Sequence, residues 1–128
     1  MVSRDTRVHL VAVVLAIAIF AVVSRFDFAT DGPEYLVAFL VSYGIIFGGA
    51  HLYLAARGDD GMVPAESRWR YVAVVAVFLL VGALLWVAGD AALGPVTVRQ
   101  VGLAVLALTA LVYLAVESVS GYRATQLE

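Results

Sequence analysis

Long apolar runs alternate with short polar segments along the whole chain. Four runs stand out, at residues 8–24, 35–56, 71–88 and 100–120. A bilayer core of about 30 Å needs roughly 20 helical residues, so every run is long enough to cross it, the first only just. Helices are expected rather than open strands, because a sheet edge would find no hydrogen-bond partners in lipid. The pattern predicts an all-α integral membrane protein, with residues 1–128 forming a single four-transmembrane-helix bundle.

The polar residues between the runs carry signals for helix ends. Asp31 and Thr97 are each followed three residues later by Glu or Gln, the spacing of a capping box before the second and fourth helices. Gly58 and Gly89 closely follow the predicted ends of the second and third helices, where a left-handed residue is common. We therefore expect side-chain caps at the two starts and left-handed glycines after the two ends.

The basic residues predict an orientation. All eight are arginine, which hints at a GC-rich prokaryotic source. With four spans, six of them fall on one side of the membrane: Arg4, Arg7, Arg57, Arg68, Arg70 and Arg123. Only Arg25 and Arg99 fall on the other, and the basic side normally faces the cytoplasm. We expect a multi-pass protein of the cell membrane with both termini in the cytoplasm.

Three short motifs recur at nearly constant spacing. The pairs are VAVV at 11–14 and 72–75, GP at 32–33 and 94–95, and YLA at 53–55 and 113–115. Constant spacing favours two parallel helical-hairpin repeats. A chain rich in Ala, Val and Leu also produces such matches by chance, so both interpretations stay open at this point.

Composition supports the membrane assignment and narrows the function classes. Hydrophobic residues make up 63% of the 128 residues, charged residues only 14%, and the mean hydropathy is +0.99. An ordinary globular domain is roughly half apolar and about a quarter charged. The net charge of -2 and the lack of a basic cluster argue against nucleic-acid binding. The expected partners are the lipid bilayer and either further copies of the chain or another membrane subunit.

Small residues mark the second helix as a packing element. At 100° per residue, Gly44, Gly48 and His51 fall on one face, and Ser42 and Gly49 fall nearly opposite. Small residues at four-residue spacing let helix backbones approach closely in lipid. We therefore assign a helix-packing role to Ser42, Gly44, Gly48, Gly49 and, on the fourth helix, Gly102.

The fourth helix carries one polar stripe. Its members are Gly102, Thr109, Tyr113, Glu117 and Ser120. A carboxylate inside a membrane span is costly, so Glu117 should face the bundle interior or reach the interface. His51 and Glu117 each lie six residues before an arginine that ends their helix, and should therefore sit at similar depth. His51, Glu117 and Tyr113 are the candidate proton or cation path; the alternative is a solvated Glu117 and a packing His51.

No signature of catalysis or of a cofactor stands out. The chain has no cysteine, and its two histidines, His9 and His51, fit no recognisable ligand motif. No nucleophile has an adjacent base, so we do not expect an enzyme. Because no ligand motif is present, we expect neither a metal site nor a bound cofactor. The leading expectation is a non-enzymatic accessory or scaffold subunit, or a homo-oligomer, that acts through helix packing. The alternative is a small oligomeric transporter or channel that uses His51 and Glu117.

Overall fold

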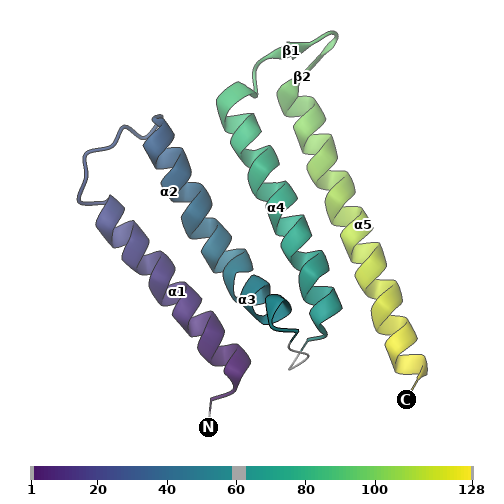
Figure 1. Cartoon of the computed structure of the whole chain (residues 1–128). Coiled ribbons are helices and arrows are strands. Elements are labelled where there is room, and N and C mark those ends of the chain that lie inside the picture. The colour runs from purple at the N-terminus through teal and green to yellow at the C-terminus, as the bar shows by residue number, and fades with distance from the viewer. Residues whose placement is uncertain (1, 59–62, 128) are drawn as a thin grey trace. The chain divides into compact units, whose positions relative to one another are not determined.

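The computed structural model describes residues 2–58 and 63–127 (Figure 1). The chain divides into two compact units, Met1–Val75 and Ala76–Glu128. The elements are α1 Arg4–Val23, α2 Pro33–Gly44, the π-helix η1 Ile45–Gly49, α3 Ala50–Ala56, α4 Ala65–Ala88, β1 Ala92–Leu93, β2 Val96–Thr97 and α5 Val98–Gln126. The helix α4 passes from one unit into the other.

Four helical segments are long and apolar enough to cross a membrane. They are α1, the continuous segment Pro33–Ala56, α4 and α5. The prediction of a helical chain with four such segments is confirmed. The helices extend beyond the apolar runs, since α1 begins at Arg4 and α5 continues to Gln126. Hydropathy marks the part of a helix that suits lipid, whereas capping and hydrogen bonding decide where the helix itself ends.

Side chains cap the starts of α1 and α5, whereas α2 starts differently. Ser3 caps α1, with its hydroxyl accepting a hydrogen bond from the backbone N–H of Thr6. Thr97 and Gln100 form the predicted capping box of α5. The predicted cap by Asp31 is wrong: Gly32 is the N-cap residue of α2 and no side chain caps it. Pro33 takes the first helical position, where its missing N–H needs no partner and its fixed φ suits the helix.

The two predicted left-handed glycines have different outcomes. Gly58 has a φ of 64°, as expected after a helix end, and this prediction is confirmed. Gly89 does not have a positive φ, so the prediction for it is wrong. A Cβ at Gly89 would instead clash with the Leu85 carbonyl oxygen and lie 2.8 Å from the Arg99 guanidinium nitrogen Nη2. The lack of a side chain at Gly89 therefore makes room for both the Leu85 carbonyl and Arg99.

The π-helix η1 interrupts the second membrane-crossing segment. A π turn holds more residues than an α turn, so the faces before and after it no longer keep one register. The projection that placed Gly44 and His51 on one face assumed an uninterrupted α-helix and is wrong across η1. The buried residues of this segment are Ser42, Gly48, Ala50, Leu54 and Ala55.

The first unit packs α1 against α2, η1 and α3 through small side chains. Ala12 and Ala16 are the buried apolar residues of α1. Gly48 is buried, and a Cβ built there would lie 3.5 Å from Val75 Cγ1 of α4. The hydroxyl of Ser42 is fully buried and has no hydrogen-bond partner within the described ranges 2–58 and 63–127. Small size, which lets helices approach closely, is therefore the property that Ser42 contributes here.

The second unit is a helical hairpin whose connection contains a short antiparallel ribbon. Strands β1 and β2 pair Ala92 with Thr97 and Leu93 with Val96. Gly94 begins the two-residue turn with a φ of 64°, which a type II′ turn requires at that position. The sequence predicts only a short loop here, because two-residue strands give no alternating pattern. Further along, Gly102 of α5 lies against Leu85 of α4.

Candidate functional site

A buried ion pair joins the first turns of two helices. Arg68 of α4 donates from Nη2 to Oδ2 of Asp5 on α1 over 2.7 Å. Only 1% of Arg68 and 7% of Asp5 is exposed. An acid suits the first turn of a helix because the helix dipole is positive there, whereas an arginine does not. Arg68 therefore needs the Asp5 carboxylate as compensation for both burial and position.

Two histidines complete a closed set of contacts. Arg68 Nη1 lies 3.1 Å from Nδ1 of His51 on α3, and His51 Nε2 lies 3.4 Å from His9 Nε2 on α1. His9 Nδ1 then lies 2.7 Å from the backbone oxygen of Asp5. We call these four residues, Asp5, His9, His51 and Arg68, the polar ring. The ring of Tyr71 packs beside His51, with centroids 4.6 Å apart.

Hydrogen-bond chemistry fixes the direction of every bond in the polar ring. A guanidinium only donates, so His51 Nδ1 must accept and its Nε2 must carry the proton. That N–H points to His9 Nε2, which must therefore accept. His9 then carries its proton on Nδ1 and donates it to the carbonyl of Asp5, which can only accept. One state, with both imidazoles neutral, satisfies all four contacts.

This arrangement holds three helices together. Its members come from α1, α3 and α4, and the ion pair spans a sequence separation of 63 residues. The polar groups bond to one another, as buried polar groups must if burial is to be tolerated. One donor, Arg68 Nε, has no hydrogen-bond partner within residues 2–58 and 63–127. In those ranges no group of three or more His, Cys, Asp or Glu residues is arranged to hold a metal ion.

The structure places the predicted proton or cation path in two units. His51 belongs to the polar ring of the first unit, whereas Tyr113 and Glu117 lie on α5 in the second. The predicted polar stripe coincides with the less exposed face of α5: Gly102 is buried, and Thr109, Tyr113, Glu117 and Ser120 are half-buried. Both ring nitrogens of His51 already have partners, so a bond to Glu117 would replace one of them. The pairing of His51 with Glu117 stays a prediction.

The five predicted packing residues differ in burial. Ser42, Gly48 and Gly102 are buried, and Gly44 and Gly49 are half-buried. A Cβ at Gly102 would lie 2.5 Å from Leu85 Cδ2, closer than side chains tolerate. The nearest atom to a Cβ at Gly49 would be Ile45 Cγ2 of the same helical segment, at 3.6 Å. Close packing against α4 therefore involves Gly48 in the first unit and Gly102 in the second.

Sequence reasoning missed Asp5 and Arg68 as site residues. Both lie outside the apolar runs, where charged residues are normally solvated. Asp5 precedes His9 by four residues, so the two share a helix face once α1 is known to begin at Arg4. The four-residue spacing of Asp5 and His9 was the signal in the sequence that these two residues lie side by side. It becomes visible only if the first helix is extended from the apolar run into the polar residues before it. Nothing local indicates Arg68 as the partner, because the contact joins distant parts of the chain.

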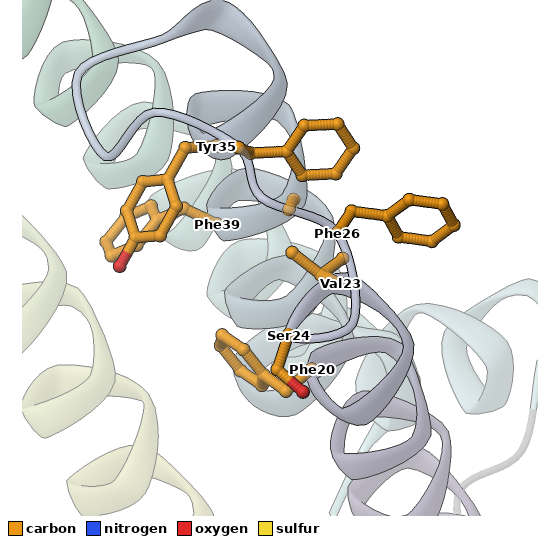
Figure 2. A pocket seen from close by; sticks show the side chains of 8 residues that line it. Phe20, Val23, Ser24, Phe26, Tyr35 and Phe39 are labelled. Carbon is orange, nitrogen blue, oxygen red and sulfur yellow. The ribbon is translucent and has the colours of Figure 1, made fainter.

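A second feature of the first unit is an aromatic pocket of about 180 Å³, which lies where α1 ends and α2 begins (Figure 2). Its lining residues are Phe20, Val23, Ser24, Phe26, Phe28, Tyr35, Ala38 and Phe39. The Ser24 hydroxyl donates to the Ala21 carbonyl over 2.8 Å. The lining has no charged side chain to orient a ligand, so the polar ring is the stronger candidate site.

No protein-family model matches the chain, and neither a curated protein nor a solved structure matches it.

Proposed function

We propose that the chain is a non-enzymatic protein of the cell membrane that acts through helix–helix association. It serves as an accessory or scaffold subunit of a membrane complex, or as a homo-oligomer. The polar ring is the observation that carries this proposal. Its ionisable side chains are hydrogen-bonded to one another and tie α1, α3 and α4 together, which is a structural use of these groups.

The apolar helix faces supply the surface for association. Within the spans of α4 and α5, only Arg68 and Gly102 are buried, and large aliphatic side chains such as Leu80, Leu108 and Leu111 are more than 60% exposed. In a bilayer, either lipid or another helix can cover such a face. A neighbouring helix covers it where the two helices pack closely against each other. The arginine distribution supports an orientation with both termini in the cytoplasm.

Native mass spectrometry after gentle extraction tests the association. We expect a complex heavier than the 13.6 kDa chain, either with a second polypeptide in fixed stoichiometry or with several copies. A second polypeptide supports the accessory role, and several copies support the homo-oligomer. A single chain in both detergent and lipid nanodiscs would contradict the proposal.

The glycines provide a mutational test of the same idea. Gly44→Leu adds bulk at a half-buried position, whereas Gly48→Leu adds it at a position already packed against Val75. We expect Gly44→Leu to reduce the fraction of assembled protein and Gly48→Leu to reduce the stability of the chain itself. Unchanged assembly in Gly44→Leu would remove Gly44 from the association surface.

The half-buried stripe of α5 favours a second candidate function. Glu117, Tyr113 and Ser120 lie on one face of a membrane-crossing helix, and intramembrane carboxylates often mark ion pathways. A small oligomeric transporter or channel with a proton or cation path would use this face. In proteoliposomes, Glu117→Gln should then abolish a pH-dependent flux. The matched control is Glu66→Gln, since the Glu66 side chain is 87% exposed.

A further inference from the structure

The polar ring has no vacant site for an additional proton. Arg68 already donates to His51 Nδ1, and His51 donates to His9 Nε2, which holds the last lone pair on the imidazoles. A proton on His9 Nε2 would place two N–H groups face to face. A proton on His51 Nδ1 would face the guanidinium in the same way. Either protonation must break a bond of the ring.

Protonation of the histidine pair acts on the longest contact of the polar ring, which joins His9 Nε2 to His51 Nε2. The Nε2–Nε2 distance of 3.4 Å exceeds the usual range of about 2.7–3.2 Å for N–H hydrogen bonds, whereas the Arg68–Asp5 contact is 2.7 Å. Both histidines are half-buried, so water can reach them. The charges of Arg68 and Asp5 cancel, so an added proton leaves the ring with one uncompensated positive charge.

The charged and titratable neighbours of the histidine pair come from α1 and α4. From α1 the neighbouring charge is Asp5, and from α4 the neighbours are Arg68 and the ring of Tyr71. The segment η1, which also packs on α1, has the sequence IIFGG and brings no titratable side chain. Tyr43 of α2 meets Phe20 edge to face, near the other end of α1. The Asp5 carboxylate is already engaged by Arg68.

We propose that the polar ring is a proton-binding site that releases the first turns of α1 from α3 when a proton enters the histidine pair. Among the four side chains of the polar ring, imidazole is the one whose ordinary titration range lies nearest neutral pH, so acidification acts first on the histidine pair. Protonation at His9 separates His9 from His51, whereas Arg68 keeps its bonds to the Asp5 carboxylate and to His51 Nδ1. The proposal holds for either function given above, because it concerns the geometry of the first unit alone.

Nitrogen NMR of ¹⁵N-histidine protein in lipid nanodiscs tests the proton assignment directly. At pH 8 we expect two different neutral tautomers, with the proton on Nδ1 of His9 and on Nε2 of His51. At pH 5 we expect imidazolium signals from the pair. Two identical tautomers at pH 8, or a pattern unchanged at pH 5, would overturn the proposal.

Distance measurements test the release. The chain has no cysteine, so Val2→Cys and Ala56→Cys place two spin labels at exposed positions on the two sides of the ring. Between pH 8 and pH 5 the mean label separation should increase by roughly 5 Å, about one helical turn. The change should reverse when the pH is restored.

The control variant carries His9→Gln and His51→Gln together. Glutamine can accept from Arg68 and donate across the pair, but it does not titrate. The label separation in this variant should stay the same at both pH values. A constant separation in the labelled parent, or an equal increase in the glutamine variant, would show that the histidine pair is not the switch.

Discussion

Each of the two units is held together internally by a different kind of contact. In the first, the polar ring joins residues as far apart as Asp5 and Arg68. In the second, the connection between α4 and α5 is built from neighbours: the N–H of Arg99 donates to the carbonyl of Gly89, and Thr97 caps its own helix. Because the polar contacts of the first unit are buried, a single substitution among them has a large effect on its stability. The second kind distributes a smaller stabilisation over several local groups.

Removing Arg68 should have the largest effect on stability. Arg68→Met keeps much of the volume but leaves the Asp5 carboxylate buried without its partner. Breaking a buried pair by removing one member costs about 3–5 kcal/mol. The measurement is the free energy of unfolding in mixed micelles titrated with a denaturing detergent.

Arg70→Met is the matched control for Arg68→Met. Arg70 lies two residues after Arg68 on α4, pairs with Glu66, whose side chain is 87% exposed, and donates to the Ser67 hydroxyl. An ion pair that water reaches contributes about 0–1 kcal/mol, so this variant should lose clearly less stability than Arg68→Met. Equal losses in the two variants would contradict the view that the polar ring stabilises the first unit.

Filling the contact at Gly102 should have the next largest effect. A Cβ there would lie 2.5 Å from Leu85 Cδ2, so Gly102→Ala forces the Leu85 side chain to move. Overpacking of this kind costs about 1–3 kcal/mol. The control is Gly121→Ala on the same helix, where a Cβ would have no neighbour within 4 Å.

The Gly121 control separates packing from helix propensity. Alanine is favoured over glycine in a helix by about 1 kcal/mol, and both variants gain this term. The difference between their unfolding free energies therefore reports the clash with Leu85 alone. Leu85→Ala should remove that difference, and a difference that persists in the Leu85→Ala background would place the strain elsewhere.

The contrast between the units also explains what the sequence predicts. The four apolar helices, the capping box at Thr97 and the left-handed Gly58 depend on residues close in sequence, and these predictions are confirmed. Asp5 and Arg68 were missed because their meeting depends on how distant helices pack. The π turn at η1 was missed because no residue pattern in IIFGG distinguishes it from an α turn.

The two left-handed glycines permit a direct comparison of the units. Gly58 and Gly94 each have a φ of 64°, and a Cβ at either would have no neighbour within 4 Å. Alanine at either position therefore adds backbone strain without a steric clash. Gly58→Ala should lower the unfolding free energy by about 1–2 kcal/mol, the cost of a left-handed conformation. Gly94→Ala should lower it at least as much, because the first central position of a type II′ turn needs a mirror-image conformation that an L side chain adopts even less readily. A smaller loss at Gly94 would mean that its turn relaxes to a different backbone conformation.

The helix caps should have the smallest effect. Thr97→Ala removes the hydroxyl that accepts from the Gln100 N–H, and Ser3→Ala removes the one that accepts from the Thr6 N–H. The loss of an N-cap costs about 0.5–2 kcal/mol. Thr97→Ala should fall in this range, and hydrogen exchange should rise in the first turn of α5 while Gly102 and the helix interior stay protected.

Ser3→Ala adds a different consequence, because the first turn of α1 carries Asp5. Fraying there exposes the Asp5–Arg68 pair to water, so the effect of Ser3→Ala should shrink in an Arg68→Met background, whereas the effect of Thr97→Ala should be the same in both backgrounds. If both caps were independent of Arg68, the polar ring would not depend on the order of the first turn of α1.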